Sequence, residues 1–253
     1  MNKHEKIEQI VTHLQYFSDF QIEIIEGLLH YLTSKFDFIH NSENSDIATI
    51  DFMESFGEIL RIHHYFSNEP FTKDKFEFAF ARVLNYCGHK AVLSPKGRQG
   101  YDIRVDETRI SLKTQADSKI KANKIHISKF MELGKGSWET IQDLGNLRMR
   151  FMNHIKDYDR IFSLRCLCKG EIWSYQLVEI PLDLLMESAQ GDLYFVKKSK
   201  QIPIPAYCDV TTASGENKFR LYFDGGTERK LQVKDLLVKY CKLHGAWKFK
   251  GPS

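Results

Sequence analysis

Two residues in one short segment, Asp102 and Lys113, have the types and the spacing that phosphodiester chemistry needs. Apolar residues follow the aspartate in the run 102–105, a polar turn comes next, and a second run spans 109–115, so a two-stranded hairpin is predicted. If both side chains point into one cleft, the carboxylate can hold Mg²⁺, while the ammonium positions the attacking water and offsets charge on a phosphate. The same pattern also fits an exposed hairpin with alternating charges.

The elements predicted around this hairpin indicate an α/β protein, with a mixed sheet flanked by helices and an N-terminal helical extension. Capping signals and apolar residues at helical spacing predict helices at about 7–14, 18–34, 52–62, 72–88, 137–156, 182–188 and 234–243. Apolar or alternating runs predict strands near 91–94, 102–105, 109–115, 124–128, 161–167, 172–179, 218–223 and 229–232. We expect a helical region at 1–66 and a core domain at 67–253.

Length and composition are those of an ordinary globular protein, with 253 residues, 42% hydrophobic and 27% charged. No apolar run approaches the ~18 residues that a membrane span needs, and the N-terminus lacks the apolar stretch of a signal peptide. The five cysteines include no C-x-x-C pair, which favours reduced thiols in a cytoplasm over a disulfide framework or a zinc site. The glycines of 134–136 and 225–226 lack P-loop spacing, so no nucleotide cofactor is indicated.

The net charge of +3 conceals an uneven distribution along the chain. Residues 1–95 carry 8 Lys/Arg against 14 Asp/Glu, whereas residues 96–135 carry 10 against 5 and residues 215–253 carry 9 against 4. Positive charge therefore gathers around the predicted hairpin and in the C-terminal block. This clustering favours a polyanion as partner, although a solvated basic face would give the same counts.

Three blocks of sequence resemble a known lineage of nucleases. They are 124–138 (KIHISKFMELGKGSW), 174–181 (SYQLVEIP) and 221–232 (LYFDGGTERKLQ). The hairpin looks like that of the PD-(D/E)XK nuclease fold, and the blocks are similar to the Sma-type lineage of type II restriction endonucleases, which cuts the palindrome CCCGGG to blunt ends. The likeness runs from about residue 56 to residue 247 and is thinner before it.

The resemblance implies roles for residues on and near the hairpin. Asp102 would bind Mg²⁺, Lys113 would orient water and stabilise charge, and Glu77 would assist metal binding from the preceding helix. Ser111 stands where the motif usually has a second Asp or Glu. Because serine supplies no anionic charge, either Glu77 or a backbone carbonyl and waters must complete the metal site. Gln115, on the Lys113 face of the strand, can hydrogen-bond a metal-bound water or a phosphate, or support the site from outside.

Base recognition needs Arg or Lys against guanine, or Asn or Gln against adenine. The resemblance places candidates in two loops, with Lys135 and Trp138 in one and Arg229 and Lys230 in the other. His126 alternates with apolar neighbours, so we expect it to face away from them, as a polar surface residue or a DNA-backbone contact. Each candidate can touch a phosphate as readily as a base. The C-terminal part of the core domain would thus carry the DNA-recognition elements.

Together these observations predict a cytoplasmic type II restriction endonuclease that cleaves double-stranded DNA at a short GC-rich palindrome, with CCCGGG the leading candidate. Mg²⁺-dependent hydrolysis would leave 5′-phosphate ends. A palindrome is matched most simply by a homodimer, and the resemblance implies a cognate DNA methyltransferase encoded separately. Two alternatives remain open: a repair or structure-specific nuclease of the same fold, and a catalytically inactive DNA-binding module.

Overall fold

The computed structural model describes residues 2–41, 45–95, 100–117 and 119–252, and it contains two sheets. The first sheet has seven strands in the order β1-β12-β7-β6-β4-β3-β2. Its strands are β1 (Asp37–His40), β2 (Ala91–Leu93), β3 (Ile103–Val105), β4 (Thr108–Gln115), β6 (Arg160–Cys168), β7 (Ile172–Glu179) and β12 (Lys242–Lys250). The sheet is mixed, because β4 runs parallel to β6 while the other neighbours are antiparallel.

The second sheet has five antiparallel strands in the order β5-β11-β10-β9-β8. Its strands are β5 (Lys124–Glu132), β8 (Asp192–Phe195), β9 (Ala206–Thr211), β10 (Asn217–Asp224) and β11 (Lys230–Leu237). The chain passes from β4 in the first sheet to β5 in the second, which is one of several connections between the two sheets. Strands β1, β8, β9 and β12 were not predicted from the sequence.

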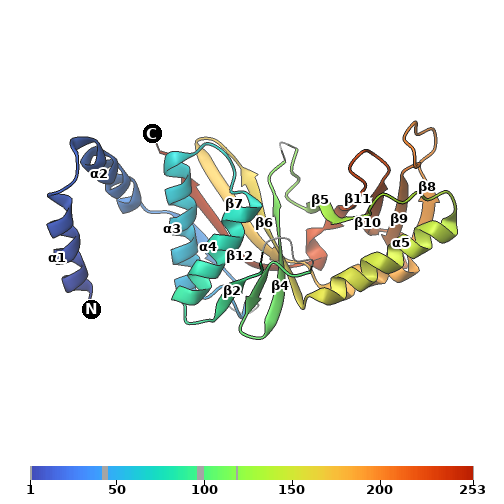
Figure 1. Cartoon of the computed structure of the whole chain (residues 1–253), viewed down its shortest axis with the longest axis horizontal. Helices are drawn as coiled ribbons and strands as arrows, with labels where there is room; N and C mark the ends of the chain where they lie inside the picture. The colour runs from blue at the N-terminus through green and yellow to red at the C-terminus, as the bar shows by residue number, and fades with distance from the viewer. Residues whose placement is uncertain (1, 42–44, 96–99, 118, 253) are drawn as a thin grey trace.

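Helices cover both sheets, and the predicted α/β architecture of a mixed sheet flanked by helices is confirmed (Figure 1). The α-helices are α1 (Lys3–Leu14), α2 (Asp19–Thr33), α3 (Ile50–Phe66), α4 (Lys73–Tyr86), α5 (Ile141–His154) and α6 (Leu182–Met186). The short 3-10 helices are η1 (Ile155–Asp157), η2 (Glu187–Gln190) and η3 (Val238–Tyr240). Helices α3 and α4 lie over the first sheet, and α5 runs along the second. None of the helices in the described ranges is both long and apolar enough to cross a membrane.

Each sheet has its own hydrophobic core. The first core joins α3 and α4 to one face of the first sheet, and aromatic rings such as Phe56 and Phe80 fill it. The second core lies between α5 and the second sheet. Neighbouring residues of one strand can belong to different cores because side chains alternate along a strand. On β6, for example, Phe162 faces the first core while Ile161 faces the second. Strand β4 therefore lies in a sheet that is packed on both faces.

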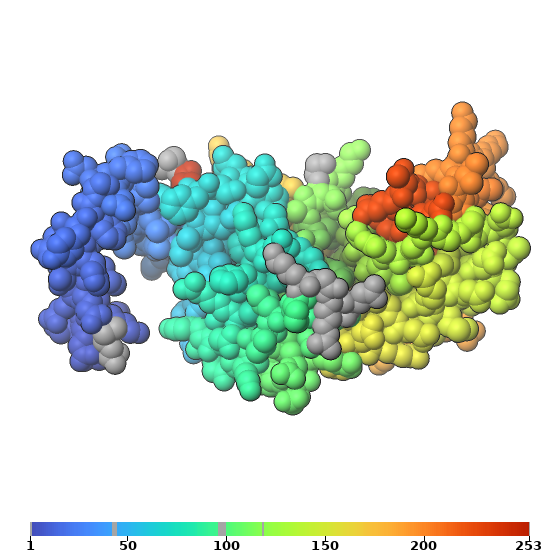
Figure 2. Space-filling view, in the orientation of Figure 1, coloured from blue at the N-terminus to red at the C-terminus, as the bar shows by residue number. Residues whose placement is uncertain are grey.

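The N-terminal helices α1 and α2 contain no buried residues, and α1 stands apart from the body of the molecule (Figure 2), whereas the end of α2 contacts α3 through hydrogen bonds from Arg61 to the carbonyls of Tyr31 and Leu32. The predicted capping box of α2 is present, with the Ser18 side chain accepting from the backbone of Gln21. By contrast, α3 packs in the first core with α4, and β1 pairs with β12. The division between 1–66 and 67–253 stays a prediction, although α3 and β1 pack with elements of the core domain.

The helix predicted at 234–243 is wrong, because this segment continues β11, turns through η3 and enters β12. The spacing of apolar residues predicted a helix because Val233 and Leu236, three residues apart, both pack into the second core. A register shift lies between them, and Asp235 adopts a positive φ of 54°. Such a bulge turns residues three apart onto one face of a strand and so imitates helical spacing.

A buried charge cluster joins β6, β7 and β12 at one end of the first sheet. The Arg160 guanidinium donates to Glu179 at 2.7 Å and to Asp46 at 2.7 Å, and His244 Nε2 lies 2.8 Å from Glu179. Burial by itself would raise the pKa of Glu179, but the hydrogen bonds from Arg160 and His244 outweigh it and lower the pKa to about 2. The ionised carboxylate therefore helps to hold three strands together.

The depressed pKa of Glu179 predicts a stability that depends on pH. The contribution is fully present above the unfolded value of about 4.3 and is lost as the pH falls toward the folded value of about 2. Glu179→Gln should therefore lower the free energy of unfolding by roughly 2–4 kcal/mol at pH 7 and by much less near the folded pKa. Urea unfolding at several pH values measures this, with the exposed Glu171→Gln as control. An equal loss at all pH values would contradict the assignment.

Candidate active site

The hairpin of β3 and β4 fixes the carboxylate of Asp102. This residue lies just before β3, and its Oδ2 accepts from the backbone N–H of Leu112 at 2.6 Å and from the Ser111 hydroxyl at 3.1 Å. Ser111 is fully buried. Ser111 thus supplies no charge, but it holds Asp102 in one orientation, with Oδ1 turned toward α4.

A second carboxylate, from α4, approaches the same point. Lys73 Nζ donates to Asp102 Oδ1 at 2.7 Å and lies 3.1 Å from Glu77 Oε1, so one ammonium bridges the two carboxylates. Burial would lower the pKa of Lys73, but the charges of Asp102 and Glu77 raise it overall. Sequence reasoning missed Lys73, although a lysine one helical turn before Glu77 could have drawn attention to it.

Lys113 lies on β4 with its side chain partly buried. Its Nζ is 5.3 Å from the centroid of the Phe130 ring, on β5. Burial lowers the pKa of Lys113 to about 8, while the charge of Asp102 acts in the opposite direction. The lysine thus belongs to the same electrostatic environment as the carboxylate, and the structure brings together the two residues that the sequence analysis proposed first.

Tyr158 adds a hydroxyl that no sequence pattern indicated. Its side chain is buried, and its hydroxyl has no hydrogen-bond partner in the described part of the chain. Burial and the nearby charge of Asp102 both raise the pKa of Tyr158, so the phenol stays neutral. An unpaired buried hydroxyl is costly, and a water or a phosphate oxygen at the site would satisfy it.

The residues fit a hydrated Mg²⁺ ion. No group of three or more His, Cys, Asp or Glu side chains that could hold a metal occurs among the described residues. Mg²⁺, however, commonly keeps several waters and uses only one or two carboxylates. Asp102 and Glu77 already converge on one cation, the ammonium of Lys73, so they stand at a separation that a shared cation can bridge.

Gln115 lies elsewhere on the same strand. It is buried, and its Oε1 accepts from Arg165 Nε at 3.2 Å. Arg165 is fully buried too, and it also donates to backbone carbonyls of the segment between β4 and β5. The structure therefore places Gln115 in a network that holds this segment, whereas Asp102, Glu77, Ser111 and Lys113 gather at the carboxylate site.

The two loops that the sequence analysis proposed for DNA recognition lie side by side. Lys135 and Arg229 line one cavity of about 600 Å³, together with the 225–227 turn. The Arg229 guanidinium donates to the backbone carbonyls of Lys135 and Gly136, which ties one loop to the other. Lys230 Nζ lies 3.1 Å from a carboxylate oxygen of Glu228.

The other two candidates have different surroundings. Trp138 is buried, and its Nε1 donates to the carbonyl of Ile204 at 2.8 Å, so the indole supports the 134–136 loop from the core and offers little surface for a contact. His126 projects from β5 into a separate cavity next to Lys234. Burial and the charge of Lys234 lower its pKa, which leaves the imidazole neutral at pH 7.

Comparison with known proteins places this arrangement in a class. A sequence model for type II site-specific deoxyribonucleases matches residues 10–249, so the protein is an enzyme that cuts DNA at specific sites. The chain belongs to this family, the SmaI family. The type II restriction enzyme SmaI of Serratia marcescens is 43% identical over 212 residues, which cover 83% of this chain and 84% of that enzyme. No solved structure matches the chain.

Proposed function

We propose that this restriction endonuclease hydrolyses double-stranded DNA in a Mg²⁺-dependent reaction at a PD-(D/E)XK site formed by Asp102, Glu77 and Lys113. The observation that carries the proposal is the convergence of two carboxylates on one cation, next to a partly buried lysine on the adjoining strand. Fold alone would not justify a mechanism, since one scaffold can host several functions. The family and the geometry of the site support it together.

In the proposed mechanism Asp102 and Glu77 hold the metal, and Ser111 and the backbone of β4 fix Asp102. Mg²⁺ held there would supply Lewis-acid chemistry, which lowers the pKa of water and offsets charge on a phosphate. The Lys113 ammonium orients the attacking water and stabilises the negative charge that grows on the phosphate oxygens. Water attacks phosphorus in line as the bond to the 3′-oxygen breaks, which leaves a 5′-phosphate and a 3′-hydroxyl.

We further propose a GC-rich palindrome as the target, with CCCGGG as the leading candidate. The support is the likeness to the Sma-type lineage, which extends through the loops that carry Lys135, Arg229 and Lys230 as well as through the catalytic strands. Arg229 and Lys135 have the side chains that guanine recognition uses. A palindromic target suggests a twofold homodimer. We also propose that the enzyme acts in the cytoplasm and that a separate methyltransferase protects host DNA there.

Digestion of two matched plasmids tests this proposal. One carries a single CCCGGG, and the other has that locus changed to CCCGGA, a single change that should cost ~1–3 kcal/mol of specificity at one base pair. We expect one blunt cut with 5′-phosphate ends in the first plasmid and none in the second. Cutting that persists at the altered locus, or that maps elsewhere, would refute CCCGGG. A smear, or cutting only at branched DNA, would favour a repair or structure-specific nuclease, and binding without any cutting would favour an inactive module.

A further inference from the structure

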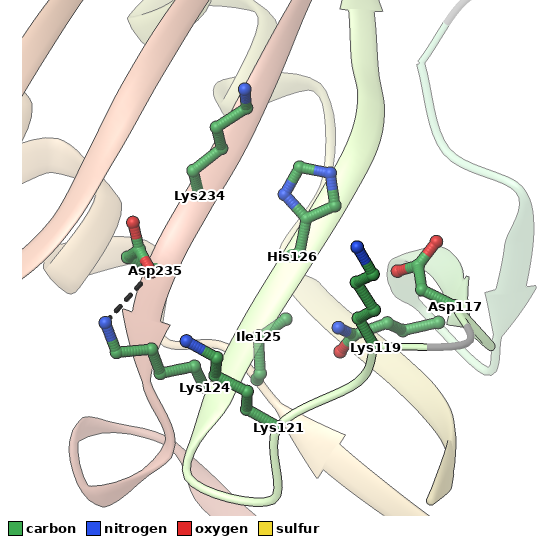
Figure 3. A pocket seen from close by; sticks show the side chains of 9 residues that line it. Asp117, Lys119, Lys121, Lys124, Ile125, His126, Lys234 and Asp235 are labelled. Carbon is green, nitrogen blue, oxygen red and sulfur yellow. Dashed lines mark hydrogen bonds and ion pairs between the residues drawn. The ribbon is translucent and has the colours of Figure 1, made fainter.

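A lysine-lined cavity of about 320 Å³ opens beside the second sheet, and neither Asp102 nor Glu77 lines it (Figure 3). Its charged and polar lining comes from the end of β4, the segment between β4 and β5, the start of β5 and β11: Gln115, Asp117, Lys119, Lys121, Lys124, His126, Lys234 and Asp235. Four lysines against two aspartates leave a net positive charge before the histidine is considered. An anion is the ligand that such a lining favours.

The lysine segment is held in place from beneath by Arg165. This guanidinium, fully buried, donates to the carbonyls of Lys121 at 2.7 Å, Ala122 at 3.1 Å and Lys124 at 2.7 Å. It also donates to the Gln115 side chain at 3.2 Å. The backbone that carries the lysines is therefore fixed, so less entropy is lost when their side chains bind a ligand.

The lysines differ in how far they are already paired. Lys124 Nζ lies 2.9 Å from Asp235, and Lys234 Nζ lies 3.7 Å from the centroid of the Tyr222 ring. Lys119 and Lys121 are exposed. Among the described residues Lys234 forms no direct ion pair, although the charges of Asp224 and Asp235 act on it, so its ammonium can still contact an anion.

The cavity lies on the same side of the first sheet as the catalytic lysine. Side chains of β4 alternate, and Gln115, which lines the cavity, is two residues beyond Lys113 on a strand paired with β6 without a register shift. Two residues span about 7 Å along a strand. Two nucleotide steps along one DNA strand rise by about the same distance. A duplex whose backbone follows β4 away from the carboxylates would present its next phosphates toward the lysines.

We propose that this cavity binds a backbone phosphate of the DNA substrate, about two to four nucleotides from the bond that is cut. Lys119, Lys121 and Lys234 supply the charge, and neutral His126 donates one hydrogen bond. The inference rests on the proposed function, because it takes the DNA bound at the carboxylate site as its ligand. It assigns His126 the DNA-backbone contact that the sequence left open beside a polar surface role. The lysines position the duplex and do not touch the reacting atoms.

The test compares DNA binding by Lys119→Ala/Lys121→Ala and by Lys234→Met with binding by Lys248→Ala/Lys250→Ala. The control pair is exposed on β12, outside the cavity. Dissociation constants for a CCCGGG duplex are measured without metal at several salt concentrations. We expect a loss of about tenfold or more for the cavity variants only, with a salt slope shallower by about one for each phosphate contact removed. Unchanged affinity and slope would overturn the proposal.

A second measurement locates the contact. Duplexes that carry one neutral methylphosphonate at successive positions are bound to wild type and to Lys119→Ala/Lys121→Ala. At one position near the cut, the methylphosphonate should weaken binding by wild type. At that position it should not weaken binding by the variant, because the lysines that would contact the phosphate are already absent. Additive losses at every position would overturn the assignment. If wild type binds the duplex and cuts it but the cavity variants match wild type, only the cavity proposal fails. If wild type neither binds nor cuts it, the proposed function fails first.

Discussion

Lys113→Ala should abolish DNA cleavage while binding to the target duplex survives. The substitution removes the ammonium that, in the proposed mechanism, orients water and stabilises charge on the phosphate, whereas the loops around Arg229 and Lys135 are unchanged. Catalysis of this kind lowers an activation free energy by several kcal/mol. We therefore expect the substitution to raise the activation free energy by at least about 4 kcal/mol, which lowers the single-turnover rate roughly a thousandfold. Rapid-quench cleavage at saturating enzyme measures the rate, and a mobility shift without metal measures binding.

Two further variants isolate the charge of Lys113 from its packing. Lys113→Met keeps most of the aliphatic stem that lies near Phe130 and should be as inactive as the alanine variant. Lys75→Ala removes an exposed lysine from α4, near the site but without contact to either carboxylate, and should cut at the wild-type rate. Near-normal turnover by Lys113→Met would show that packing, and not charge, explains the loss.

Asp102→Asn should remove cleavage in Mg²⁺ and in Mn²⁺, because an amide cannot replace the anionic oxygen that faces the cation. Glu77→Gln should lower cleavage activity less, since the Glu77 carboxylate is the more exposed of the two and has no hydrogen bond from β4. Mn²⁺ should restore part of the activity of this variant because Mn²⁺ tolerates other ligands better than Mg²⁺. Titration calorimetry with Mg²⁺ in the absence of DNA should show weaker binding in both variants. A harsher loss for Glu77→Gln than for Asp102→Asn would reverse the order of the ligands.

The hairpin could be predicted from sequence because strand alternation is local. Period-two spacing put Ser111, Lys113 and Gln115 on one face, and the register of β4 against β6 confirms this. Alternation could not reveal what each side chain touches, since Arg165, which binds Gln115, lies on a strand far along the chain. In the same way, Lys73 reaches Asp102 only because α4 packs against the sheet.

Other errors arose where local patterns were ambiguous. The bulge between Val233 and Leu236 produced helical spacing in a strand. The short strands β8 and β9 carry their tyrosines and charges on one face and small or apolar residues on the other, in runs too brief for a sequence-based assignment. Trp138 was proposed from its place in a loop, but its burial depends on the fold around Ile204.

The two separate hydrophobic cores have an evolutionary consequence. The residues that would hold the scissile phosphate are anchored in the first, while the loops of Arg229 and Lys135 rise from strands that pack in the second. Substitutions that reshape those loops can be accommodated by the second core without disturbing the first. A lineage built in this way can diversify the sequences that it recognises while inheriting one machinery for breaking the bond, which suits enzymes under pressure to distinguish ever-changing invaders from their host.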